Sequence, residues 1–157
     1  MLFSRFDALQ VQHDAGRRLL RFQWLDPANH YLRPALEHGR DLVVTHQPTH
    51  VLMDFHGLPP VSLADELWAS VHWLPRIAAQ PLQSVALVLR SEHLHNQLVI
   101  EATLWACRHL VRFELQVFEH VPAALDWLLQ GDDAAARHLQ AEWEAGVAAP
   151  RAAALPS

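Results

Sequence analysis

The chain has a single cysteine, Cys107, which excludes an internal disulfide and a metal cluster built from cysteine thiolates. Cys107 falls within an apolar pattern of helical spacing, so we expect a small side chain that fills the core. Glycine is also sparse, with five residues in 157. The sequence contains no Gly-x-Ser-x-Gly motif and no glycine-rich phosphate loop. These absences argue against a hydrolase with a nucleophile elbow and against a nucleotide site of the P-loop kind.

Long runs of basic or apolar residues are lacking as well. The longest basic run is the pair Arg17-Arg18, and the formal net charge is −5, so the chain lacks the basic stripe of a nucleic-acid-binding protein. No apolar run approaches the ~20 residues needed to span a bilayer. The first seven residues lack the basic region and apolar stretch of a signal peptide. We therefore expect a cytoplasmic protein without a transmembrane segment.

The apolar patterns that are present predict a single α/β domain. Strands over 8–13 and 19–24 alternate apolar and polar residues around a turn at Gly16, which predicts an antiparallel hairpin. The runs 51–53, which leads into Asp54, and 85–89 are apolar without alternation, as in strands of a parallel sheet that are covered on both faces. The segment 112–118 alternates and carries charges, which is typical of an edge strand. We expect a mixed, mostly parallel sheet of about five strands with helices packed on it.

Helices are expected between these strands and at the end of the chain. Their starts are signalled at or near Asp26-Pro27, Ser62, Ser91, Val121 and Asp132. Gly131 closes the fourth helix and Gly146 the fifth. The α/β domain is therefore expected over 1–131, and a C-terminal helix with an Ala/Pro-rich tail over 132–157.

Helical periodicity assigns a core-facing side to each helix. In the two middle helices these sides are Leu63, Leu67, Val71 and Leu74, and Leu94, Leu98, Ala102 and Trp105. Trp73 falls off the apolar side of its helix, and an exposed tryptophan often marks a contact surface. Leu139 and Trp143 are the large apolar residues of the last helix. We expect them to dock on the sheet or on a second subunit, and the latter predicts a homodimer through the C-terminal helix.

The segment 50–68 combines a buried strand, a loop and a capped helix. Open α/β sheets usually place their sites where a strand ends and turns into a helix. Asp54 ends the strand, Ser62 is suited to cap the helix, and Asp65 is placed to return a capping contact. Asp54 is either a general base or ligand-binding carboxylate, or a structural acceptor for N–H groups of the loop. We favour the structural role.

The sequence resembles the STAS superfamily, which includes small domains of sulfate transporters and bacterial anti-sigma-factor antagonists. The resemblance is carried by the order of elements and by the segments Val51-Leu52-Met53-Asp54-Phe55 and Ala123-Ala124-Leu125-Asp126-Trp127-Leu128. It is closest to the stand-alone bacterial branch related to lipid-transfer domains of the CRAL-TRIO kind. Phospho-switched members carry an Asp-Ser pair where this chain has Ser62 and Leu63, so the usual phosphoserine is missing. We expect Ser62 to cap the helix, and a role as a phosphate acceptor is the alternative.

Histidine is abundant, with 12 residues, but its spacing does not predict a metal site. His46 and His50 lie near one end of the strand 50–54 and His56 beyond the other, roughly 15 Å away at about 3.3 Å per residue. His93 and His95 point to different sides if they lie on a helix, and could bind a metal together only from a loop, if the helix starts later. Asp54, His56 and Ser62 are too close on one loop to form the usual line of a catalytic triad. We expect neither a metal nor another cofactor.

We therefore expect a non-catalytic regulatory or binding module whose protein partner or small apolar ligand is unknown. The expected interaction surface is the strand-end loop and the helix after it, with Asp54, His56, Gly57, Ser62, Asp65 and Trp73. One alternative is a carrier of a lipid-like molecule, which predicts a continuous apolar cavity of a few hundred Å³ between sheet and helices. Another is an enzyme that uses Asp54 and His56, which predicts a deep polar cleft that holds both side chains.

Overall fold

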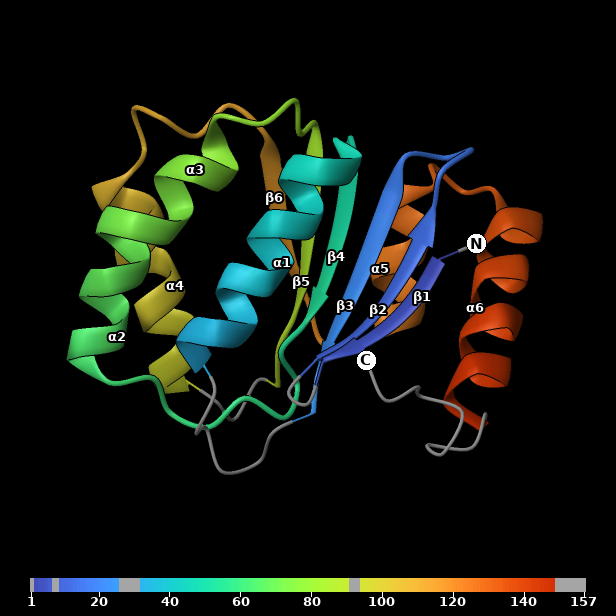
Figure 1. Ribbon diagram of the computed structural model, residues 1–157, viewed down its shortest axis with the longest axis horizontal. Coiled ribbons are helices and arrows are strands. Elements are labelled where there is room, and N and C mark those ends of the chain that lie inside the picture. The colour runs from blue at the N-terminus through green and yellow to red at the C-terminus, as the bar shows by residue number, and fades with distance from the viewer. Residues whose placement is uncertain (1, 7–8, 26–31, 91–93, 149–157) are drawn as a thin grey trace.

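A six-stranded mixed sheet lies at the centre of the computed structural model and has helices on both faces (Figure 1). The structure describes residues 2–6, 9–25, 32–90 and 94–148. The strands lie in sequence order: β1 (Leu2–Phe6), β2 (Leu9–Asp14), β3 (Leu19–Trp24), β4 (His50–Asp54), β5 (Ser84–Val88) and β6 (Glu114–Phe118). The first three pair antiparallel, and β3 to β6 pair parallel. The expected α/β class and mostly parallel sheet are confirmed, and β1 is a further strand that the pattern did not predict.

The helices divide between the two faces of the sheet (Figure 1). One face carries α1 (Leu32–His46), α4 (Leu94–Ala106) and a continuous helical run between them in sequence. That run consists of α2 (Leu63–Trp68), the π-helical segment η1 (Ala69–Trp73) and α3 (Leu74–Ala78). The other face carries α5 (Val121–Leu128) and α6 (Asp133–Ala148). None of the described helices is long and apolar enough to cross a membrane.

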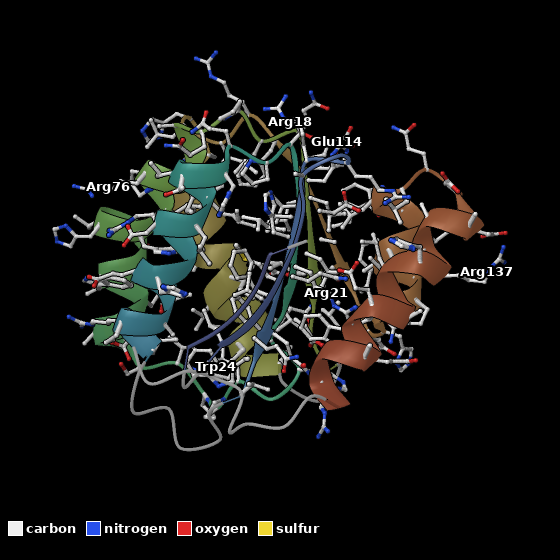
Figure 2. The ribbon with its side chains drawn as sticks, turned by 45° about the vertical axis from the view of Figure 1, so that its right-hand side comes forward. Arg18, Arg21, Trp24, Arg76, Glu114 and Arg137 are labelled. Carbon is white, nitrogen blue, oxygen red and sulfur yellow. The ribbon has the colours of Figure 1, made fainter. Side chains whose placement is uncertain are left out.

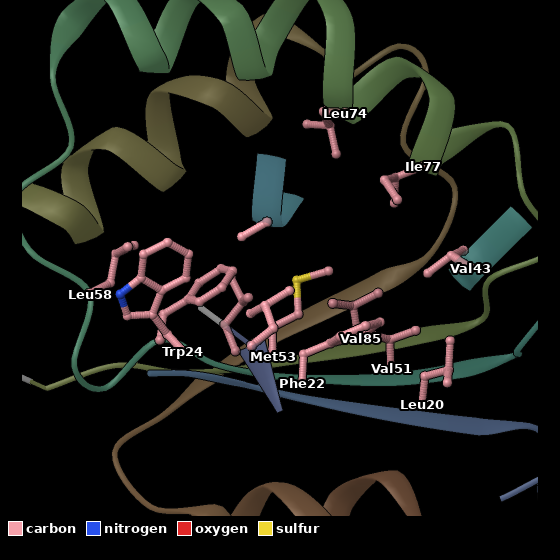
Figure 3. Packing of buried hydrophobic residues seen from close by; sticks show 14 of the residues in the cluster. Leu20, Phe22, Trp24, Val43, Val51, Met53, Leu58, Leu74, Ile77 and Val85 are labelled. Atoms are coloured by element: carbon pink, nitrogen blue, oxygen red, sulfur yellow. The ribbon is translucent and has the colours of Figure 1, made fainter. Parts of the chain in front are cut away.

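The alternation of side chains along β4 divides the core into two parts. Val51 and Met53 belong to the larger cluster under α1, α3 and α4, whereas Leu52 belongs to a smaller cluster with α5 and α6. Within the larger cluster, Leu74 and Ile77 of α3 face the sheet residues across the interior (Figure 3). The central strands β4 and β5 are therefore covered on both faces, as their unbroken apolar runs predict.

The last helix docks on the sheet of its own chain. Leu139 and Trp143 are 0% and 5% exposed, and the Leu139 carbonyl accepts a 2.9 Å hydrogen bond from Gln12 Nε2. Arg21 lies between the sheet and α6 (Figure 2), with its Cζ 3.9 Å from the centre of the Trp143 ring. Leu139 and Trp143 are thus used internally. The helix also continues through Gly146 to Ala148, so Gly146 does not end it; a glycine inside a helix costs only about 1 kcal/mol.

The helical run 63–78 turns its predicted core side outward. Leu63, Leu67 and Val71 are 69%, 57% and 63% exposed, whereas Leu74 is 4% exposed. The cause is the π-helical segment, in which the N–H of Leu74 donates to the carbonyl of Ala69, five residues back. A π turn contains one residue more than an α turn, and one residue of an α-helix corresponds to ~100° of rotation. The π turn therefore rotates the side chains before it by ~100° relative to those of α3, compared with a regular α-helix. The four residues therefore cannot share one side, and the expectation that they do is wrong.

The core side of α4 is also opposite to the expected one. Leu94, Leu98 and Trp105 are 60%, 54% and 67% exposed, and Ala102 is exposed as well. The inward side carries Asn96, Val99, Ile100 and Thr103. Both sides of this helix are rich in apolar residues, so periodicity did not distinguish them.

Several boundaries are as predicted. The strands 9–14 and 19–24 form the hairpin, and α5 is followed by Gly131 with a φ of 79°, the left-handed conformation expected after a helix. The edge strand begins at Glu114, two residues later than expected, and Cys107 is buried as predicted. The predicted caps at Asp26-Pro27 and Ser91, and the residue His93, lie outside the described residues.

Candidate ligand-binding pocket

An apolar pocket of about 110 Å³ lies between the sheet and the helices α1 to α4. The sheet contributes its floor and the helices its walls; Met53 and Val85 face Leu74 and Ile77 across it (Figure 3). The other apolar side chains around it come from the helices, the loop after β4, the strands β5 and β6, and the residue before β6: Leu32, Leu36, Phe55, Leu58, Val61, Ala69, Trp73, Leu87, Val99, Ile100, Leu104, Phe113 and Leu115. Such a lining selects hydrocarbon over water.

Among the described residues, four polar side chains line the pocket; Asp65, Asn96 and Thr103 have partners within the protein, and Glu66 is half-buried on its wall. Asp65 Oδ1 accepts a 2.8 Å hydrogen bond from Arg33 Nε, as part of an ion pair between α2 and α1. Thr103 Oγ1 donates to the Val99 carbonyl of its own helix at 2.8 Å. A ligand in the pocket would therefore meet mainly carbon atoms.

Asn96 fixes the loop that closes one end of the pocket. Its side chain is 2% exposed, and its amide nitrogen donates to the carbonyls of Leu58 and Pro59, both at 3.0 Å. Its amide oxygen accepts from the backbone N–H of Val61 at 2.9 Å. Nε2 of His95 lies 2.7 Å from the Val61 carbonyl oxygen. The loop after β4 is thus attached to the first turn of α4.

The π-helical segment contributes Ala69 and Trp73 to the pocket wall. Pro75 lies two residues after the end of this segment and has no N–H to donate to the α-helical pattern. The Trp73 ring nitrogen donates to the Leu36 carbonyl of α1 at 2.7 Å, which holds the indole between the two helices. π turns of this kind are frequently found at functional sites.

Asp54 has a structural contact and lies away from the pocket. It is 6% exposed, and its Oδ1 accepts a hydrogen bond from the backbone N–H of His56 at 3.0 Å, which is the role we favoured. Along β4 it alternates with Met53, so it lies on the face of the sheet opposite the pocket. Burial raises the pKa of the Asp54 carboxyl, against the opposing effects of the His56 N–H and of Arg21.

The other predicted surface residues divide between the pocket and the solvent. Asp65 and Trp73 line the pocket, so the prediction that Trp73 is an exposed contact residue is wrong. Ser62 is exposed and accepts a 3.1 Å hydrogen bond from the Asp65 N–H, as expected of a helix cap. Gly57 is exposed in a turn, and His56 is half-buried. The structure therefore brings two of the six predicted residues together at one site.

The histidines do not form a metal centre within the described part of the chain, where no group of three or more His, Cys, Asp or Glu could hold an ion. His46 stacks on His13, with ring centres 4.2 Å apart. His50 places Nδ1 2.8 Å from Thr49 Oγ1, and His56 follows the opposite end of β4. Burial lowers the pKa of His13, as does the neighbouring His46.

Sequence patterns missed most of the pocket. Asn96 and Thr103 stand on the side of α4 that was expected to be exposed, and Phe113 precedes an edge strand. The available signal was the second apolar row of α4, formed by Val99, Ile100 and Leu104.

Comparisons of the chain with family models, with curated proteins and with solved structures gave no match. A proposal about function therefore depends on the geometry of the pocket itself.

Proposed function

We propose that the protein is a non-catalytic binding module that takes a small apolar ligand into the pocket between its sheet and helices. The observation that carries this proposal is a pocket of about 110 Å³ whose walls are almost entirely hydrocarbon. A cavity of about 150 Å³ lined by Leu, Ile and Phe admits benzene. The ligand we propose is accordingly an aromatic ring or a short branched chain, or one such group of a larger molecule.

The size of the pocket also bears on the carrier alternative. A carrier of a whole lipid would need a cavity of a few hundred Å³, and the pocket is smaller than that. We therefore favour a sensor-like module, in which a small ligand sets the packing of the helices, over a lipid carrier. The resemblance to stand-alone STAS domains supports a regulatory role of this kind.

A catalytic role for Asp54 and His56 has less support. The carboxylate of Asp54 is engaged by the backbone of its own loop, and it lies on the opposite face of β4 from the pocket-lining Met53. A reaction would require both side chains to face a bound substrate. The contacts of Asp54 favour a role in fixing the turn after β4.

The proposal can be tested with isoleucine methyl groups as reporters. The two isoleucines of the chain, Ile77 and Ile100, both line the pocket, so isotope labelling of isoleucine restricts the NMR spectrum to this site. We expect toluene and indole to shift both methyl signals in a saturable manner. Mass spectrometry of the natively purified protein would then search for the physiological ligand.

A matched pair of variants distinguishes ligand binding in the pocket from binding at the surface. Ala69→Trp fills the pocket from η1 and should abolish the methyl shifts, whereas Ala64→Trp places the same side chain at an exposed position of α2 and should retain them. The proposal is overturned if neither compound shifts the methyl signals of the folded wild type. It is also overturned if Ala69→Trp, shown by circular dichroism to be folded, responds as the wild type does.

A further inference from the structure

The outer side of α2, η1 and α4 carries an unusual concentration of exposed apolar side chains. We name it the outer apolar face: Leu63, Leu67, Val71, Leu94, Leu98 and Trp105, each between 54% and 69% exposed. Spacings of four and seven residues place each row along one side of its helix. A contiguous apolar area of this kind on a folded protein marks an interaction site.

The two rows belong to one surface. α4 contacts both α2 and η1, so the rows are carried by neighbouring helices. On each helix the pocket-lining residues lie on the other side: Asn96 is two positions from Leu98, a rotation of ~200°. Since the pocket lies between these helices and the sheet, both rows point away from the sheet on the outside of the molecule.

We infer that a second copy of this chain covers the outer apolar face in a symmetric dimer. The six side chains expose on the order of 700 Å² in total, close to the ~800 Å² per partner of a standard stable interface. Two-fold symmetric dimers are the commonest assemblies, and each copy contributes the same patch. The face is therefore large enough to be covered by its own copy.

The charges beside Trp105 also suit a second copy. Glu101 is exposed on the same side of α4 as Leu98 and Trp105. Arg108 follows the end of the helix, with its Cζ 3.9 Å from the centre of the Trp105 ring. Seven residues, about two helical turns, separate these opposite charges, and Trp105 lies near their midpoint. An antiparallel contact between two α4 helices would bring each Glu101 against the Arg108 of the other copy, so that a symmetric pair matches opposite charges at both positions.

This inference does not depend on what occupies the pocket. Sedimentation velocity of the full chain from 1 to 100 µM should show a particle of twice the 17.8 kDa chain mass. Leu67→Glu and Trp105→Glu should each give a monomer, because they place a charge inside the interface. Val44→Glu and Val147→Glu, at apolar positions of α1 and α6 that are 45% and 51% exposed, should remain dimeric.

Charge reversal tests the proposed symmetry. Glu101→Arg should weaken the dimer roughly tenfold or more by placing two like charges together, and the double variant Glu101→Arg/Arg108→Glu should restore it. A wild type that stays monomeric at 100 µM overturns the inference. If that monomer binds phosphatidylcholine vesicles and Trp105→Glu does not, the face belongs to a membrane surface instead. A dimer that persists in both Leu67→Glu and Trp105→Glu also overturns it.

Discussion

The side-chain oxygen of Asn96 accepts a hydrogen bond from the backbone N–H of Val61, and this 2.9 Å contact joins α4 to the loop after β4. The same side chain donates to the carbonyls of Leu58 and Pro59. A buried amide that makes three hydrogen bonds to one loop fixes the conformation of that loop. The loop, in turn, contributes Leu58 and Val61 to the pocket.

Replacing Asn96 should destabilise the protein. We expect Asn96→Ala to lower the free energy of unfolding by about 2–3 kcal/mol, because two buried carbonyls and one N–H lose their partner. Urea unfolding followed by circular dichroism measures the change. Gln97→Ala, at the neighbouring position, is the control and should stay within about 0.5 kcal/mol of the wild type. An equal loss in both variants would contradict the role assigned to Asn96.

Trp143 is buried and Trp105 is exposed, with exposed fractions of 5% and 67%. We expect Trp143→Ala to lower the free energy of unfolding by about 3–5 kcal/mol, the usual cost of removing a buried tryptophan. It also removes the ring that stacks on the guanidinium of Arg21. Trp105→Ala should cost far less in urea unfolding at low micromolar concentration. Similar losses would show that α6 does not depend on Trp143 for its docking.

The pocket leaves room for one additional methyl group. Val99→Ile extends a pocket-lining side chain and should raise the free energy of unfolding by about 0.5–1 kcal/mol, because it fills part of the cavity. The same change should weaken binding of toluene. Val147→Ile, on the exposed side of α6, provides the comparison. A loss of stability in Val99→Ile would indicate that this part of the pocket is already filled.

The raised pKa of Asp54 predicts a pH-dependent stability. Burial raises the pKa above its ordinary value of 3.8, so the folded state holds the proton more tightly than the unfolded chain. Ionisation therefore lowers the free energy of unfolding as the pH rises from 3.8 through the folded-state pKa. We expect Asp54→Asn, which can still accept from the His56 N–H, to be more stable than the wild type at pH 7.

Measuring the free energy of unfolding at several pH values tests this predicted pH dependence. The advantage of Asp54→Asn should shrink as the pH falls and vanish below about pH 3.8. Urea unfolding at several pH values measures it, with the exposed Asp41→Asn as the control. An advantage of the same size at pH 7 and at pH 3 would mean that the effect arises from packing and not from ionisation.

Cys107 should react slowly with thiol reagents in the folded protein. The thiol is buried, lies 3.2 Å from the Ser70 carbonyl oxygen, and has a pKa raised by burial. Both the low access and the low thiolate fraction slow its attack on a disulfide reagent. We expect the rate at pH 8 to be at least ~100-fold lower than in urea-unfolded protein. An equally rapid reaction in the folded state would place Cys107 on an accessible surface.

Residue patterns predicted the strands β2 to β6 because the signals there are local. The apolar runs of β4 and β5, the turn at Gly16 and the glycine after α5 each determine their element through nearby residues. The same holds for Ser62, whose cap is a contact within one turn. These features can be predicted without knowing which residues pack against them.

The orientation of the helices could not be predicted in the same way. α4 has apolar residues on both sides, and only the sheet decides whether Leu98 or Ile100 faces inward. The run 63–78 looks like one α-helix in sequence, although Leu74 bonds to Ala69 in a π turn. The pocket was missed for this reason, because its walls are formed by the sides of these helices that periodicity assigned to solvent.

The π turn also lets this helix hold one extra residue without changing which side faces the pocket. Deleting one residue from 70–72 would leave the Leu74 N–H and the Ala69 carbonyl four residues apart, so the run would become a regular α-helix with α2 and α3 in the same relative orientation. Asp65 and Glu66 would then keep their places on the pocket wall. A regular α-helix of the full length would instead turn α2 by ~100° relative to α3 and bring its leucines toward the sheet.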